Sequence, residues 1–224
     1  MAKAASFLTG IFLLTAVFCG PAMAELLIIE EITGPLSFKS GGQEYVFPAF
    51  YAPDNDALTP LLGQTIDGRK GPPDRWQRIT LTSPATLQLL EDGRIQLQPL
   101  TSAPAAAELT AEQKAQAASR GLWQQDCCKV LEAGSAGKGI NSWRVISGTV
   151  TSVTARRNVT YVNFGDDWRT DFTVVVPARL ARNLQPATWQ GHKVEVRGYL
   201  TWRYGPSITL SHAAQICLPD SATP

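Results

Sequence analysis

The stretch RVISGTVTSVTARRNVTYVNF, residues 144–164, consists of two segments rich in β-branched and aromatic residues, separated by the polar run ARRN. Such residues are enriched in β-strands, and a polar run between two strand segments marks a turn. Three further segments of the same character follow at 171–176, 193–202 and 207–212, and residues 178–184 are predicted to be helical. The sequence therefore predicts five strands with one helix between the third and the fourth.

This order of elements is that of an OB-type barrel. The earlier part of the chain mixes short strand and helix segments, so the predicted fold class is mainly β within the α+β class. Residues 25–140 hold 10 basic and 14 acidic residues, whereas 141–224 hold 9 and 5. This asymmetry indicates two domains, predicted at 25–131 and 142–218. The small, flexible run EAGSAGKGIN at 132–141 is predicted to be the linker.

The N-terminus has the features of a secretory signal peptide. Lys3 precedes an apolar stretch at 7–18, and Ala22-Met23-Ala24 supplies the small residues that signal peptidase prefers. We expect residues 1–24 to be removed and the mature protein to be periplasmic or secreted. A membrane anchor is the weaker alternative, because the apolar run is shorter than the ~20 residues that a span needs. The mature chain has 19 basic and 19 acidic residues, which argues against a polybasic nucleic-acid coat.

Three cysteines remain after signal removal, and the expected compartment favours disulfides. We expect one of Cys127 and Cys128 to pair with Cys217, which leaves one free thiol. Such a bridge closes a loop of about 90 residues and contributes on the order of 4 kcal/mol. A zinc site is the alternative, but C-x-x-C spacing and a nearby histidine are both missing from the sequence.

Four motifs follow one another in the first half of the chain. They are YAPD at 51–54, DRWQR at 74–78, LQLLEDGRIQLQP at 87–99 and AEQKAQAASRGLW at 111–123. Each is weak alone, but in this order they resemble the staphylococcal-nuclease-like, or thermonuclease, family over about 100 residues. The resemblance implies that the first domain is also a five-stranded OB-type barrel, with helices packed on it.

The resemblance also implies a phosphodiester hydrolase. In that family two acids hold a calcium ion, a glutamate activates water and two arginines neutralise the phosphate. The family's pattern places Asp54 at the catalytic glutamate and Arg78 at the second arginine. Because aspartate is one methylene shorter, its carboxylate lies about 1.5 Å back from the water. A displacement of that order can cost ~10²-fold in rate.

The other positions of the family's site hold residues that lack its chemistry. Val46 stands at the first arginine and Tyr51 at a metal-binding aspartate, while Ile32 and Gly34 stand at the acidic positions upstream. We therefore predict no working catalytic group, with Asp54 and Arg78 as remnant positions only, and no metal site or cofactor. The first domain is expected not to cleave nucleic acid by the family's mechanism.

Two nearby acids keep an enzyme alternative open. If the upstream alignment shifts by one residue, Glu31 takes a metal position. Asp56 is the other substitute, although an acid beside Asn55 is more typical of a turn. In either case the protein would be a metal-dependent nuclease or phosphodiesterase with relocated ligands, and calcium would be its cofactor.

The stretch TYVNFGDDWRTDFTV at 160–174 resembles the C-terminal OB-like extension of some bacterial thermonuclease-type proteins. An OB barrel that binds single strands uses aromatic side chains to stack bases and arginines to contact the backbone. The candidate ligand-binding residues are Tyr161, Asn163, Trp168, Arg169, Phe172, Arg197, Trp202 and Arg203. The alternative is that Phe172 fills the barrel core while Trp168 and Arg169 brace the turn.

The sequence leaves three functions open. The leading one is an exported pseudoenzyme that binds single-stranded nucleic acid, or another extended ligand such as a peptide, without cleaving it. The second is the metal-dependent phosphodiesterase described above. The third is a structural envelope protein whose barrels bind a protein partner. Salt-dependent affinity for oligonucleotides supports the first, and stabilisation by calcium supports the second.

Overall fold

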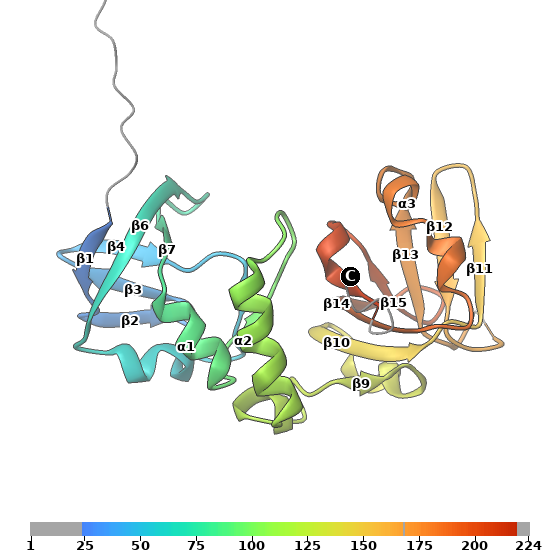
Figure 1. Cartoon of the computed structure of the whole chain (residues 1–224), viewed down its shortest axis with the longest axis horizontal. Coiled ribbons are helices and arrows are strands. Elements are labelled where there is room, and N and C mark those ends of the chain that lie inside the picture. The colour runs from blue at the N-terminus through green and yellow to red at the C-terminus, as the bar shows by residue number, and fades with distance from the viewer. Residues whose placement is uncertain (1–23, 168, 219–224) are drawn as a thin grey trace, which may run out of the picture.

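The structure is a computed structural model that describes residues 24–167 and 169–218. Over these residues the protein is α+β and mostly strands, arranged in two curled sheets that lie side by side (Figure 1). Helix α2 (Ala106–Ala117) lies between the sheets, and α1 (Ala85–Glu91) packs against α2. Within the described residues, no helix has the length and apolar character needed to span a membrane. The predicted signal peptide lies outside this part of the chain, apart from Ala24.

The first sheet has the strand order β1-β6-β7-β4-β3-β2. Its strands are β1 (Glu25–Ile28), β2 (Glu31–Gly34), β3 (Ser37–Ser40), β4 (Gln43–Val46), β6 (Thr65–Pro73) and β7 (Ile79–Thr82). β4 and β7 are parallel, and the other pairings are antiparallel. Because β1 and β2 are consecutive in the chain yet end the strand order, the sheet curls back on itself. Phe38, Leu58 and Leu81 are among the buried residues that fill it.

Short elements surround this sheet. They are β5 (Phe50–Tyr51), which pairs with β8 (Gln96–Leu97), and the 3-10 helices η1 (Asn55–Leu61) and η2 (Gly121–Gln124). Leu58 of η1 is fully buried in the first core. The chain between η2 and the second sheet contains Cys127 and Cys128.

The second sheet has the order β11-β12-β13-β15-β14-β10-β9, and β16 pairs with β14. Its elements are β9 (Leu131–Glu132), η3 (Ala133–Gly139), β10 (Ser142–Thr149), β11 (Ser152–Ala155), β12 (Val159–Asn163), β13 (Thr173–Pro177), α3 (Ala178–Leu184), η4 (Pro186–Trp189), β14 (Lys193–Trp202), β15 (Pro206–Thr209), η5 (Ala213–Gln215) and β16 (Ile216–Cys217). The predicted helix at 178–184 is confirmed as α3. The first predicted strand is split into β10 and β11 at Val150 and Thr151.

The segment predicted to be a linker, residues 132–141, is packed into the second sheet. β9 pairs in parallel with β10, and Ala133 and Ala136 of η3 are buried in the second core. A Cβ atom on Gly148 would lie 2.7 Å from the Cβ of Ala133, so glycine is needed for this close approach. Ala133, Ala136 and Gly139 are buried, so the segment is packed against the second core and is not a free linker, which corrects the prediction.

The two sheets meet through α2, which lies against the outer face of β10 and β14. Nη1 of Arg197 on β14 lies 2.6 Å from Oε2 of Glu112 on α2, and Nη2 lies 3.1 Å from Oε1 of Glu195. Nε2 of Gln116 donates a hydrogen bond to Oε2 of Glu195 at 2.7 Å. A small apolar cluster lies at the same junction and contains Ala115, Trp123 and Val145. The junction therefore buries both charged and apolar side chains.

Candidate functional site

Arg78, the predicted remnant arginine, is held in a closed turn between β6 and β7. Its Nε and Nη2 atoms lie 2.9 Å and 2.7 Å from Oδ2 of Asp74. Oδ1 of Asp74 accepts hydrogen bonds from the backbone N–H groups of Trp76 and Arg78. Burial opposes these contacts, but the hydrogen bonds win and lower the pKa of Asp74 below its usual value. The guanidinium of Arg78 is therefore already paired with the carboxylate of Asp74.

The other acids of the predicted remnant site serve local structure. Asp54 is exposed, and its Oδ1 accepts a hydrogen bond from the N–H of Asp56 at 3.0 Å at the start of η1. Glu31 forms an exposed ion pair with Lys39 at 2.8 Å. Among the side chains of residues 24–167 and 169–218 that the structure describes, no three His, Cys, Asp or Glu groups could hold a metal ion together. These residues do not provide the set of oxygen ligands that calcium needs, and no metal-dependent step is assigned to them.

The outer face of the second sheet carries a row of side chains that crosses five strands. Strand register places Thr154, Tyr161, Val175 and Thr209 side by side on β11, β12, β13 and β15. On β14, Leu200 pairs with Ile208, which places Tyr199 beside Thr209. Tyr161 is 39% exposed and Tyr199 57% exposed. The row therefore presents two tyrosine rings and no charged side chain.

This row continues into the junction between the sheets. Tyr199 pairs in register with Trp143 of β10. The ring of Trp143 lies 6.2 Å from the ring of Tyr51, a residue of β5, which lies beside the first sheet and pairs with β8. The hydroxyl of Tyr199 donates to the carbonyl of Asn141 at 2.8 Å. The exposed row of the second sheet is therefore connected, through Trp143, to Tyr51 in the first half of the chain.

A second row, made of polar side chains, runs beside the first. Its members are Ser152, Asn163, Thr173, Ser207 and Thr201. Nδ2 of Asn163 donates to Oγ of Ser152 at 3.1 Å, and the hydroxyl of Thr173 donates to Oδ1 of Asn163 at 3.0 Å. Asn163, a predicted ligand residue, is therefore held from both sides within an ordered polar surface.

Arginines border this face at one end of the strands. The β11–β12 turn and α3 carry four exposed ones, Arg156, Arg157, Arg179 and Arg182. The carbonyl of Asn158 accepts a hydrogen bond from the N–H of Ala178 at 3.0 Å, which holds the turn against α3. The acidic residues within 142–218 are Asp166, Asp167, Asp171 and Glu195. The first three follow the opposite end of β12 and the last lies at the junction, so none of these belongs to the arginine end.

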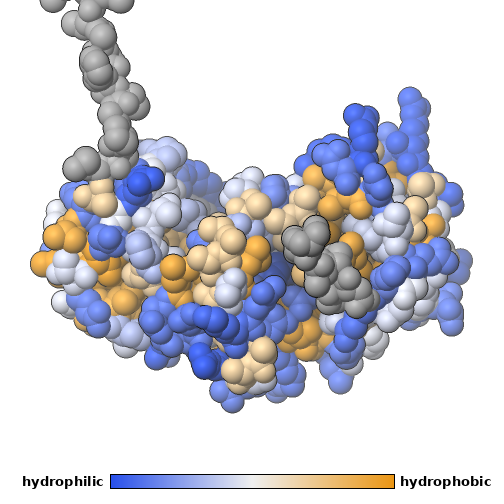
Figure 2. Space-filling view, in the orientation of Figure 1, coloured by the Kyte–Doolittle hydropathy of each residue, from blue (hydrophilic) through white to orange (hydrophobic). Residues whose placement is uncertain are grey.

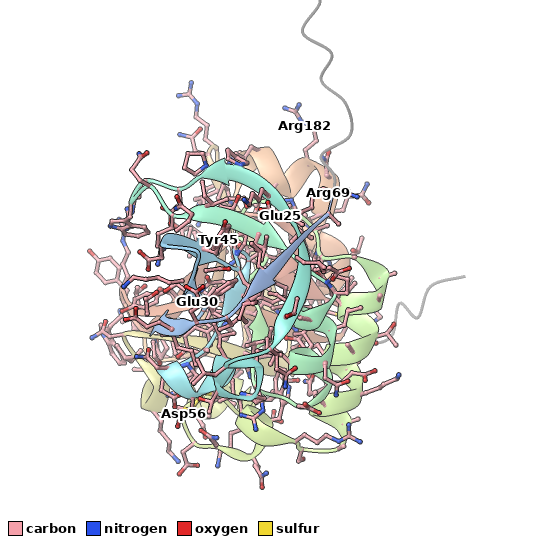
Figure 3. All side chains as sticks on the ribbon, turned by 90° about the vertical axis from the view of Figure 1, so that its left-hand side faces the viewer. Glu25, Glu30, Tyr45, Asp56, Arg69 and Arg182 are labelled. Atoms are coloured by element: carbon pink, nitrogen blue, oxygen red, sulfur yellow. A yellow bond between two sulfur atoms is a disulfide. The ribbon has the colours of Figure 1, made fainter. Side chains whose placement is uncertain are left out.

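The figures place this arginine end on one side of the molecule. In Figure 2, hydrophilic side chains project from the second sheet at the upper right, and the surface is lower between the two halves of the molecule. In Figure 3, Arg182 of α3 and Arg69 of β6 lie toward the top, whereas Asp56 lies toward the bottom.

The β14–β15 turn borders the opposite end of the face. Trp202 is 59% exposed and Tyr204 74% exposed, and Arg203 between them is also exposed. Arg169 lies in the neighbouring β12–β13 loop, where a Cβ atom on Gly205 would lie 3.2 Å from its carbonyl oxygen. The structure thus brings the loop that contains Arg169 close to the turn that contains Trp202 and Arg203. Trp168 lies outside the described residues.

Two predicted ligand residues are buried, and the structure corrects their assignment. Phe172 is 1% exposed within the second core, and its ring lies 5.1 Å from that of Phe164. Arg197 is 8% exposed and is already paired with Glu112 and Glu195. Phe172 points to the inside of the curled sheet, and α2 covers the outward-facing Arg197. Neither side chain is open to a ligand.

The buried charges of the junction stabilise one another. Burial raises the pKa of Glu112, while Arg197 and the N–H of Leu97, which donates to Oε1 of Glu112 at 2.7 Å, lower it. Burial would lower the pKa of Arg197, but the charges of Glu112 and Glu195 raise it. The 2.6 Å contact and the permanent charge of the guanidinium favour an ionised pair at neutral pH.

Two exposed aromatic residues of this surface, Tyr199 and Tyr204, were missed by the sequence reasoning. A signal for Tyr199 was present in KVEVRGYLTW, because strand alternation puts it on the face opposite to Val194 and Val196. Tyr204 lies in a tight turn with φ of 57°, and strand periodicity does not extend to such a turn.

The cysteine pairing differs from the expected one. Cys127 and Cys128 form a disulfide with each other, and Cys217 is an exposed free thiol. Cys217 lies on β16, where it pairs in register with Glu195 of β14. Adjacent cysteines are always within a short reach, whereas the fold determines whether a distant one is. The predicted bridge to Cys217 is therefore wrong.

The surroundings of Cys217 predict a slow thiol. Partial burial and the nearby charge of Glu195 raise its pKa, while Arg197 opposes the shift. Because only the thiolate reacts with iodoacetamide, alkylation in the folded protein should still accelerate above about pH 9.5, where a cysteine with the ordinary pKa of about 8.5 is already mostly thiolate. In urea-unfolded protein the rate should level off earlier. Equal pH profiles in the two states would contradict this expectation.

The chain was also compared with known proteins. No protein-family model matches it, and no curated protein matches it. The resemblance to thermonucleases therefore depends on the sequence motifs alone.

Proposed function

We propose that this protein is exported and binds single-stranded nucleic acid, without cleaving it, on the outer face of its second sheet. The observation that carries the proposal is an exposed tyrosine, Tyr161, on an uncharged strand face beside a cluster of arginines. Aromatic rings stack on bases of any sequence, and arginines neutralise the backbone phosphates. The serine and threonine row adds hydrogen-bonding groups on the side of the tyrosine row that faces away from these arginines.

Each sheet is proposed to be an OB-type barrel. The support is the strand order, in which β4–β7 and β13–β15 are parallel pairs within otherwise antiparallel paths and α3 connects β13 to β14. OB barrels bind oligonucleotides on their second and third strands and on the loops after the first and fourth strands. In the second sheet these correspond to β12, β13, the turn with Arg156 and Arg157, and the turn with Arg203.

The first half, 25–131, is proposed to be a degenerate thermonuclease-like domain. Arg78 is held by Asp74, and Asp54 caps η1, so neither remnant side chain is directed at a shared substrate position. Neutralisation of a phosphoryl transition state needs guanidinium groups that are free to pair with it. Purified protein is therefore expected to leave single-stranded DNA intact in the presence of calcium. Turnover that Arg78→Ala abolishes would contradict this part of the proposal.

The binding test uses the double variant Arg156→Ala/Arg157→Ala with a labelled single-stranded oligonucleotide. Removal of two phosphate contacts should reduce the slope of log affinity against log salt concentration by about 1.4. Tyr161→Ala should weaken binding by about 5- to 150-fold, because stacking contributes ~1–3 kcal/mol per base. Fluorescence anisotropy measured over a series of salt concentrations gives both quantities.

Two control variants show whether the binding is specific to the proposed surface. Tyr161→Phe keeps the ring and should retain most of the affinity. Arg120→Ala removes an exposed arginine that donates to the carbonyl of Glu91, away from this face, and should leave the salt slope unchanged. Absence of affinity at low salt would overturn the proposal and favour a protein partner in the cell envelope. An equal loss in Arg120→Ala and in the double variant would show binding without a defined site.

A further inference from the structure

We propose that the Cys127–Cys128 disulfide is a thiol–disulfide exchange site whose redox state controls how firmly the two sheets are joined. The inference does not depend on nucleic-acid binding. It follows from the position of the disulfide in a turn whose backbone carbonyl groups hold side chains from both sheets.

The turn that contains the disulfide contacts both halves of the chain. The carbonyl of Cys128 accepts a hydrogen bond at 2.8 Å from Nε2 of Gln96, a buried residue of β8. The carbonyls of Asp126 and Cys127 accept hydrogen bonds from Nη1 of Arg144 on β10. Three successive carbonyl groups thus join a strand beside the first sheet to a strand of the second.

The disulfide fixes the direction of these carbonyl groups. It closes a small ring that includes the peptide bond between Cys127 and Cys128, and so restricts the adjoining backbone rotations. The turn is completed by N–H groups of Cys128 and Lys129, which donate to the carbonyl of Gln125 at 3.0 Å and 2.8 Å. Reduction opens the ring and restores these rotations. Gln96 and Arg144 then lose hydrogen-bond acceptors that the disulfide had held in fixed positions.

The two sulfur atoms differ in access. Cys128 is 1% exposed, whereas Cys127 is partly exposed. A cavity of about 540 Å³ lies beside the turn and is lined in part by Asp126 and Lys129, the residues that flank the cysteines, and by Arg144. Neither cysteine lines this cavity, so access to the pair depends on the partial exposure of Cys127, and an external reagent reaches the disulfide from its side.

The reductant in this exchange is a small dithiol. Its thiolate attacks Sγ of Cys127, the S–S bond breaks, and the electron pair leaves on Sγ of Cys128, which takes up a proton. The second thiol of the reagent attacks the mixed disulfide and releases Cys127. The cysteine pair gains two electrons and two protons, and the dithiol becomes a cyclic disulfide.

The test uses the mature chain with Cys217→Ser, so that only this pair can react. Alkylation followed by mass spectrometry should find no free thiol before treatment with dithiothreitol and two free thiols after it. Hydrogen exchange should become about tenfold faster in 94–98 and 142–145 on reduction, because positioned hydrogen bonds are lost. Exchange in β12 and β13 should not change. Reoxidation should restore the slow rates.

A second variant isolates the disulfide from other effects of the reductant. Cys127→Ser/Cys128→Ser in the same background should exchange at the rate of the reduced protein and should not respond to dithiothreitol. Two free thiols in the protein before reduction would overturn the proposal. So would equal exchange rates at the junction in the oxidised and reduced forms, a comparison that needs no folding of the serine variant.

Discussion

Replacement of Arg197 by methionine is expected to lower the free energy of unfolding by about 3–5 kcal/mol, because it leaves two carboxylates without their buried partner. Glu112 and Glu195 both contact the guanidinium, and Glu112 is 1% exposed. A buried charge without a counter-ion costs far more than the pair itself contributes. Urea denaturation at neutral pH, followed by tryptophan fluorescence, measures the loss.

A second replacement separates the cost of breaking the pair from the cost of removing it. Glu112→Leu combined with Arg197→Met replaces both buried charges by apolar groups, and should recover a large part of the lost stability. Lys114→Ala breaks an ion pair with Glu91 that also lies on α2 but is exposed, and should change stability by less than about 1 kcal/mol. If Arg197→Met destabilised the protein no more than Lys114→Ala does, the junction would not depend on this ion pair.

Phe172→Ala is expected to destabilise the second sheet by about 3–5 kcal/mol, since it leaves a cavity in the core. Phe172 is 1% exposed and lies in the cluster that includes Val174 and Trp189. A residue that stacked on a ligand would give the opposite result, a loss of oligonucleotide affinity with little loss of stability. Urea denaturation and anisotropy on the same variant distinguish the two roles.

The matched comparison for Phe172 lies on the other face of the same sheet. Tyr161→Ala removes a ring that is 39% exposed and should cost less stability than Phe172→Ala. Phe172→Leu keeps most of the buried volume and should cost within about 1.5 kcal/mol. Equal destabilisation by Tyr161→Ala and Phe172→Ala would mean that the face on which we place the ligand is as well packed as the core.

Local sequence signals predicted the elements of the second sheet well. The helix at 178–184 and the strands at β12, β13, β14 and β15 follow from β-branched and aromatic runs and from the turns between them. These signals depend on neighbours a few residues apart, so one sequence contains them. The same composition rules failed at 132–141, where small residues proved to be close-packed.

Contacts between distant residues were not accessible in this way. Glu112 and Arg197 are 85 positions apart, and each is an ordinary surface residue by type. Likewise, three cysteines allow several pairings, and the choice between Cys128 and Cys217 as the partner of Cys127 depends on where β16 lies. The resemblance to thermonucleases identified positions for Asp54 and Arg78 but not the local partners that occupy them.

Because side chains alternate along any strand, the order of residues in β14 already indicates which of them share a face. Arg197 and Tyr199 therefore stand on the same side, opposite to Val196 and Leu200. That α2 covers Arg197 and leaves Tyr199 open to solvent follows from the fold and not from the order of residues in this strand. The physical reason is that alternation is a property of the backbone, whereas exposure depends on which other part of the chain packs against that face.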